Sequence, residues 1–340
     1  MESKKTNFVK ISLILMLVGI VLMVIGFLLG PKSGIYLYKN GISFDDRELV
    51  TIKESDLDIF TSIDISSNYS NIEIIESDSY GLEIRTIDNV KWSIENDSLK
   101  IDYSKKSIKK FFSLDLSNFF RENEYIKVYL PKGALLDSLK IDADAGNINI
   151  NNIPINDIYI DSDFGDITIN NLKTINMSVA NNAGNLTCKK IDAEQIILNS
   201  DFGDMSLKDI NTNSINIESN AGNVTLNNCN TKNLSVQSDF GNVSANNIVS
   251  TITDVTVNAG NITLDGDFLG NTKLKADFGN ISFNTKQDKS YYTYNFSVDF
   301  GNVSIDGKKV SHITSSSSVS SDSVLDVSVN SGNIGVYFKK

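Results

Sequence analysis

The chain has 340 residues, of which 41% are hydrophobic, and its net charge is −11. An acidic surface repels phosphate backbones and anionic lipid headgroups, so nucleic acid is excluded as a partner. A single histidine, His312, and two cysteines cannot build a zinc site of the histidine or cysteine type, and we expect no metal and no cofactor.

The first predicted element is a membrane anchor over residues 11–30. This segment has no charged residue and only Ser12 as a polar side chain, and it is long enough to cross a bilayer. Lys4, Lys5 and Lys10 precede it, which places residues 1–10 in the cytoplasm and the bulk of the chain outside the cell. No cleavage site follows, so we expect an uncleaved, single-pass protein of the cell membrane.

Residues 31–58 form a polar connector, and residues 59–138 alternate apolar and polar side chains less regularly than the rest. We interpret 59–138 as an irregular N-terminal cap on a repeated structure, because a terminal unit must protect an open sheet edge. Within it, Asn68-Tyr69-Ser70-Asn71 resembles the later repeats with serine in place of glycine. The apolar stretch Lys105–Asn123 predicts a short amphipathic helix or an excursion that covers the first coil.

From residue 139 to 340 the chain repeats, with a serine-rich loop at 308–323. A glycine returns every 19 residues and then twice at longer spacing, and we assign these glycines to a tight corner: Gly146, Gly165, Gly184, Gly203, Gly222, Gly241, Gly260, Gly279, Gly301 and Gly332. A fixed period of this length indicates one structural unit stacked many times. Nineteen residues fit one coil of a parallel β-solenoid.

The residues around each glycine support that interpretation. Apolar residues alternate with polar ones on both sides of the corner, which is typical of strands with one buried face. Asn or Asp always follows the glycine, and stacked amides can hydrogen-bond from coil to coil. The sequence therefore predicts an all-β, single-stranded parallel β-helix of about ten coils, right-handed by analogy with parallel crossovers, behind an N-terminal transmembrane helix.

A second period lies inside the first, because the residue before the glycine alternates between Ala and Phe. The pattern runs through Ala145, Phe164, Ala183, Phe202, Ala221, Phe240, Ala259 and Phe278, and it breaks at Phe300. A ring is thicker than one coil, so we expect each Phe to be buried between neighbouring coils. If the rings faced solvent instead, they would form a candidate binding ladder.

Clustered carboxylates are the remaining candidates for ligand chemistry. Asp163, Asp166, Asp201 and Asp204 flank the corners and are weak calcium candidates. The calcium-binding nonapeptide repeat requires a doubled glycine that this chain lacks, so a structural role at the corner is favoured. Cys188 and Cys229 fall in inward-facing positions, and we expect both to be buried. No catalytic motif is present, and we expect no enzyme activity.

Three segments carry a resemblance to a known family. They are Phe60-Thr61-Ser62-Ile63-Asp64-Ile65, Tyr125-Ile126-Lys127-Val128-Tyr129-Leu130-Pro131-Lys132-Gly133 followed by Leu136-Asp137-Ser138-Leu139-Lys140-Ile141, and the repeated Gly-Asn/Asp corners. With these the chain resembles the "putative adhesin" domain-of-unknown-function proteins of Gram-positive bacteria. The resemblance implies a membrane-anchored β-solenoid, often encoded near regulators of cell-envelope stress, without established catalytic residues.

We therefore expect a non-enzymatic surface scaffold or adhesin-like interaction module, tied to cell-envelope stress. Its partners would be the membrane, through the anchor, and cell-wall components, cationic peptides or another envelope protein. One alternative is an envelope glycan-binding or glycan-active protein, which requires exposed aromatic and basic residues; Tyr291, Tyr292 and Tyr294 form one such patch. Another alternative is a membrane-tethered regulatory partner on the cytoplasmic side.

Overall fold

The computed structural model describes residues 15–21, 35–38, 41–44, 49–87, 89–103, 112–114, 124–315 and 323–339. By its internal contacts the chain divides into two units. One comprises Met1–Val50 with Lys106–Asn123, and the other comprises Thr51–Lys105 with Glu124–Lys340. Each unit is described by itself below.

The first unit contains a helical segment at residues 15–21 and a small antiparallel sheet. In the sheet, β1 (Ile35–Tyr38) pairs with both β2 (Gly41–Phe44) and β9 (Phe112–Leu114). The predicted connector thus contains strands, and the described part of Lys105–Asn123 is a strand rather than a helix. Among the described residues, no helix is long and apolar enough to cross a membrane. Most of the predicted anchor, 11–30, lies outside them.

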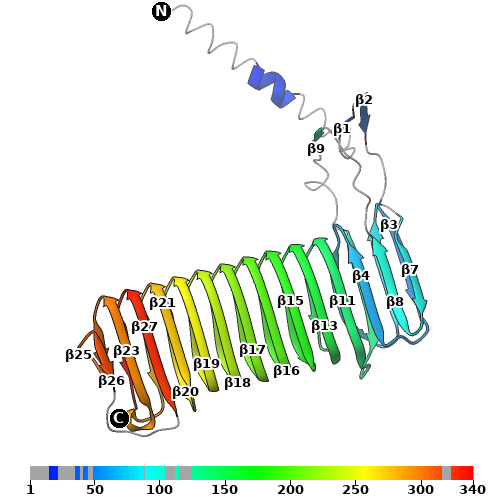
Figure 1. The fold of residues 1–340 in the computed structure, drawn as a ribbon. Coiled ribbons are helices and arrows are strands. Elements are labelled where there is room, and N and C mark those ends of the chain that lie inside the picture. The colour runs from blue at the N-terminus through cyan, green and yellow to red at the C-terminus, as the bar shows by residue number, and fades with distance from the viewer. Residues whose placement is uncertain are drawn as a thin grey trace, which may run out of the picture. The chain divides into compact units, whose positions relative to one another are not determined.

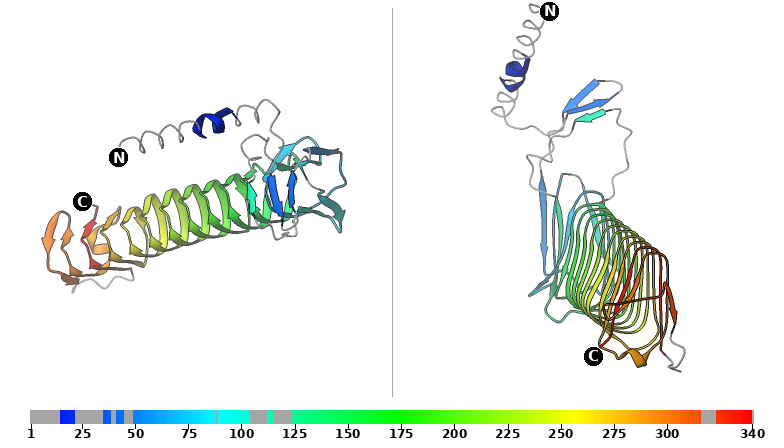
Figure 2. Two further views of the ribbon diagram at one scale, coloured as in Figure 1. Left: turned by 90° about the horizontal axis from the view of Figure 1, so that it is seen from above. Right: turned by 90° about the vertical axis from the view of Figure 1, so that its left-hand side faces the viewer.

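The second unit is the predicted stack of parallel coils (Figures 1 and 2). Its N-terminal strands are β3 (Val50–Ser55), β4 (Ser62–Ser67), β5 (Asn71–Ser77), β6 (Gly81–Thr86), β7 (Lys91–Glu95), β8 (Ser98–Tyr103), β10 (Tyr125–Pro131), β11 (Leu136–Ala145), β12 (Ile148–Asn151), β13 (Ile155–Phe164), β14 (Ile167–Lys173) and β15 (Asn176–Ala183). The central strands are β16 (Leu186–Phe202), β17 (Met205–Ala221), β18 (Val224–Phe240) and β19 (Val243–Ala259). The C-terminal elements are β20 (Ile262–Phe268), β21 (Thr272–Phe278), β22 (Ile281–Thr285), the 3-10 turn η2 (Lys289–Tyr291), β23 (Thr293–Phe300), β24 (Val303–Ile305), β25 (Lys308–Val310), β26 (Ile313–Ser315), β27 (Val324–Ser331) and β28 (Ile334–Tyr337).

Successive coils pair in parallel with a constant offset of one repeat. β16 pairs with β17 from Leu186↔Met205 to Phe202↔Ala221, and β17 pairs with β18 in the same register. Viewed along the stack, the coils superpose closely (Figure 2, right). The all-β architecture of stacked parallel coils is therefore confirmed, whereas the right-handed sense of the coil stays a prediction.

Each central coil has two corners with left-handed backbone. At the first corner Gly203 has a φ of +142° and lies directly against Gly184 of the previous coil. A Cβ on Gly203 would lie 2.0 Å from the carbonyl oxygen of Gly184, so the corner excludes every side chain. The second corner lies six residues after the glycine. There the φ values lie between 51° and 62°, at Asn152, Asn171, Lys190, Asp209, Asn228 and Asn247.

The order of coils in space departs from chain order at both ends. Near the C-terminus β27 pairs with β21 on one side and β23 on the other, so the last coil in the chain lies between the two that precede it (Figure 1). At the opposite end β4 pairs with both β8 and β11. The outermost C-terminal coil is covered by short antiparallel strands, since β25 pairs with β24 and β26 with β23. These strands include part of the predicted serine-rich loop.

The core is a continuous apolar interior that follows the stack. It is built from the inward columns of every coil, such as Ile196 and Leu198 in one coil and Ile215 and Ile217 in the next. Cys188 and Cys229 are buried in it as unbridged thiols, which agrees with the sequence-based expectation. Burial raises the pKa of Cys188 to about 12 and that of Cys229 to about 11.

The corner contact gives a first prediction. Gly203→Ala should destabilise the solenoid by more than about 3 kcal/mol, because the added Cβ meets backbone as well as an unfavourable φ. The matched control is Gly307→Ala, whose φ is +76° but whose Cβ would meet nothing within 4 Å. This control should cost about 1 kcal/mol. Urea unfolding followed by circular dichroism measures both, and equal losses would contradict the contact.

A second prediction concerns the two thiols. In the native protein neither Cys188 nor Cys229 should react with a thiol reagent at about pH 8, because both side chains are buried and protonated. In denaturant both should react, and a colorimetric thiol titration counts them. Rapid reaction of either cysteine in the folded state would mean that its column is open to solvent.

Candidate functional site

The phenylalanines before the corner glycines face solvent, so the prediction that they are buried between coils is wrong. The exposed fraction of each ring residue lies between 59% and 77%, for Tyr69, Phe164, Phe202, Phe240, Phe278 and Phe300. These six residues are called the aromatic column below. Tyr69 belongs to it because Ser70, the residue after it, lies against Gly146 and takes the corner position of that coil.

The column alternates strictly with small residues along the stack. Phe202 pairs with Ala183 on one side and Ala221 on the other, and Phe240 pairs with Ala221 and Ala259. Since coils are about 4.8 Å apart, rings recur about every 9.6 Å. The alternation that breaks in the sequence at Phe300 is intact in space.

The reason is the exchanged order of the last two coils. Ser331 pairs with Phe278 on one side and with Phe300 on the other, so a small residue again separates two rings. The aromatic column therefore continues to the outermost coil. Neither the spacing of the glycines nor the chain order gives this arrangement.

The local backbone explains why the rings point outward. In a strand every second side chain points to the core, and the third and fifth residues before the glycine do so. If the alternation continued, the residue directly before the glycine would point to the core as well. The glycine corner ends that alternation, so Phe202 is exposed while Ser200 is buried. Small polar residues occupy the buried position in five successive coils: Ser162, Asn181, Ser200, Ser219 and Ser238.

An Asp/Asn column lies beside the aromatic column, two residues before the corner glycine. Asp163, Asp201, Asp239 and Asp277 accept a hydrogen bond from an Asn side-chain amide of the next coil, at 2.6 to 3.0 Å. The donors are Asn182, Asn220, Asn258 and Asn330. Asp accompanies each Phe from residue 163 onward, and Asn accompanies most of the small residues.

A second polar column lies at the position after the glycine and joins successive coils. Asp166 accepts from the backbone N–H of Asn185 at 2.8 Å, and Asp204 accepts from that of Asn223 at 2.8 Å. This column continues through the exchanged coils, where Asn302 N–H donates to Asn333. The four calcium candidates are thus hydrogen-bond acceptors between coils, and calcium binding by them stays a prediction. The described residues contain no group of three or more His, Cys, Asp or Glu placed to hold a metal.

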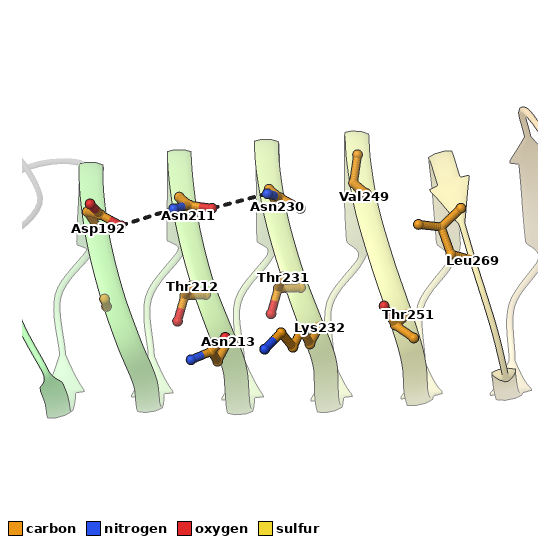
Figure 3. Close-up of a pocket in the computed structure, with 11 residues that line it drawn as sticks. Asp192, Asn211, Thr212, Asn213, Asn230, Thr231, Lys232, Val249, Thr251 and Leu269 are labelled. Atoms are coloured by element: carbon orange, nitrogen blue, oxygen red, sulfur yellow. Dashed lines mark hydrogen bonds between the residues drawn. The ribbon is translucent and has the colours of Figure 1, made fainter.

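A shallow hollow of about 410 Å³ lies on another side of the coil, across β16 to β19 (Figure 3). Asp192, Asn211 and Asn230 line it and hydrogen-bond in series at 3.0 and 3.1 Å. The Thr212 hydroxyl donates to backbone carbonyls, and that of Thr231 donates to the carbonyl of Asn233. Asp192, Asn211, Asn230 and Thr212 therefore join neighbouring coils, whereas the Thr231 hydroxyl bonds within its own coil.

Of the three tyrosines suggested from the sequence as a surface patch, only Tyr291 is partly exposed. Tyr292 is fully buried and Tyr294 nearly so, and both rings lie within 6.3 Å of Phe338 at the C-terminal end of the core. The Tyr292 hydroxyl donates to the carbonyl of Phe268, and burial raises the pKa of this tyrosine. The expectation of an exposed tyrosine site is wrong because these rings close the end of the solenoid.

A model of one protein family, the Toastrack DUF4097 family, matches residues 60–191 and 174–337. No curated protein matches the chain. Among solved structures, a "putative adhesin" from Parabacteroides distasonis is 11% identical with a TM-score of 0.43, over 85% of this chain and 98% of that one. A "putative adhesin" from Bacteroides fragilis is 15% identical with a TM-score of 0.35, over 86% and 97%. A "putative cell adhesion protein" from Clostridium sporogenes is 11% identical with a TM-score of 0.19, over 85% and 100%.

The exposure of the column gives a third prediction. Phe202→Ala should change the free energy of unfolding by less than about 1 kcal/mol, because the ring is already largely in solvent. Ile217→Ala, at a fully buried position of the next coil, should cost about 2–5 kcal/mol. Urea unfolding measures both. A large loss for Phe202→Ala would show that the ring packs between coils after all.

Proposed function

Because the chain belongs to the Toastrack DUF4097 family, we propose that it is a non-enzymatic interaction module anchored in the cell membrane. The solenoid stands outside the cell, and the aromatic column is its working surface. The single observation that carries this proposal is the regular row of exposed rings along the stack. Exposed apolar rows of this kind mark sites of protein or membrane contact.

The contrast with the polar columns supports the choice of surface. Side chains after the glycine and two residues before it donate or accept hydrogen bonds between coils, so they stabilise the stack. The phenyl rings contribute little to the stack, since most of their area is exposed. A feature that repeats without stabilising the fold is best explained by recognition of something outside the chain.

The membrane anchor rests on the sequence and on one described segment. Residues 11–30 carry no charge, and within them residues 15–21 are helical with every side chain exposed. These exposed residues include Leu15, Met16 and Leu17. Apolar side chains on all sides of a helix suit a lipid environment. The lysines that precede the segment favour an extracellular solenoid.

Protease treatment of intact cells tests the proposal, with the protein followed by an antibody to its C-terminus. We expect the C-terminal signal to disappear while cytoplasmic control proteins survive. Protection in intact cells with cleavage after lysis would place the solenoid in the cytoplasm. The surface role would then fall, and a membrane-tethered regulatory partner would replace it.

A further inference from the structure

We propose that the aromatic column is a self-association surface, at which two copies of this chain pair antiparallel and each inserts its phenyl rings between those of the other. This inference rests on the proposed function, because it names the partner for the surface assigned there. It follows from two alternations that share one period: Phe with Ala, and Asp with Asn.

The first argument is shape. Rings about 9.6 Å apart leave a gap over each small residue, and a ring inserted midway would lie about 4.8 Å from its neighbours. Aromatic rings attract each other at centroid distances of about 4.5–7 Å. A column with rings at every coil would have no such gaps, and a column with wider spacing would leave voids. The observed alternation suits a second copy of itself.

The register of the pair follows from the order of coils. A twofold axis across the column reverses its direction and places each ring over a small residue of the partner. With the axis between the coils of Ala221 and Phe240, all five phenylalanines meet a small residue. The five contacts are Phe164 with Ser331, Phe202 with Ala259, Phe240 with Ala221, Phe278 with Ala183, and Phe300 with Ala145.

The second argument is charge. The same axis keeps the Asp/Asn column of both copies on one side, so carboxylates could face carboxylates. The two-coil period prevents this at four of five positions, because Asp163, Asp201, Asp239 and Asp277 face Asn330, Asn258, Asn220 and Asn182. Each Asn amide has a second N–H and each carboxylate a second oxygen, so hydrogen bonds across the interface remain available.

The area is sufficient for a specific pair. Aromatic side chains bury about 150–250 Å² each, so five rings exposed to this extent offer roughly 600 Å² on each copy. A standard interface buries about 800 Å² per partner, and the flanking Asp and Asn side chains supply the remainder. The composition of this surface also matches that of protein interfaces, which have an apolar centre and a polar margin.

Photo-crosslinking of the full chain in its native membrane tests the pairing. The substitution Phe202→p-benzoylphenylalanine keeps the size of the ring and places a reactive group in the column. After irradiation we expect a covalent dimer, in which mass spectrometry finds the link on the peptide that carries Ala259. Crosslinks to lipid alone or to other proteins alone would overturn the pairing.

Filling the gaps between the rings distinguishes insertion of the partner's rings from nonspecific hydrophobic association. Ala221→Phe with Ala259→Phe enlarges the apolar surface but leaves no space for the partner's rings, so the dimer yield should fall at least about tenfold. The matched control is Ala221→Ser with Ala259→Ser, because Ser331 already occupies an equivalent position, and its yield should not change. An equal or higher yield with the phenylalanine variant would overturn the interdigitated arrangement.

These outcomes are distinct from those of the protease experiment. If the protein is cleaved on intact cells but crosslinks only to lipid or to other proteins, the proposed function stands and the pairing is wrong. If the protein forms the covalent dimer but is protected from protease in intact cells, the pairing stands and the surface role is wrong.

Discussion

The structure depends on one backbone contact, the stacking of glycine on glycine at the first corner. At Gly203 the neighbouring carbonyl occupies the space of a side chain, so the coils approach more closely there than any other residue allows. This contact fixes the register, because a shift of one residue would bring a Cβ into the corner. The hydrogen bonds through Asp166 and Asp204 depend on it, since side chain and backbone meet only when the corners are aligned.

Fixed corners give every position of the repeat a constant environment. A residue type at one position is then repeated as a continuous column, and a two-coil period in the sequence becomes a two-coil period on the surface. The exchanged coils near the C-terminus show how strong this constraint is. Ser331 and Phe300 are out of sequence order, yet each takes the side chain size that the column requires at its place in space.

Much of this could be predicted from the sequence, because glycine period and strand alternation are local signals that directly report backbone geometry. The stacked coils, the buried cysteines and the serine corner at Ser70 follow from them. The direction of Phe202 did not follow, because the corner ends the alternation and hydrophobicity predicts the opposite of what Ser200 and Phe202 do. The order of the last coils and the burial of Tyr292 depend on contacts between distant residues, which no periodicity contains.

Stability and recognition are therefore carried by different side chains of the same repeat. Inward residues and the amide columns hold the stack together, and their replacement would destabilise the fold. The aromatic column contributes little to the stability of the stack, so its residues could vary with little effect on folding. That it nevertheless keeps one pattern from Tyr69 to Phe300, including the two coils that are out of order, is the strongest sign that the pattern serves recognition. A surface that must fit a regular partner is constrained in this way, and the most regular partner that the structure itself offers is a second copy of the column.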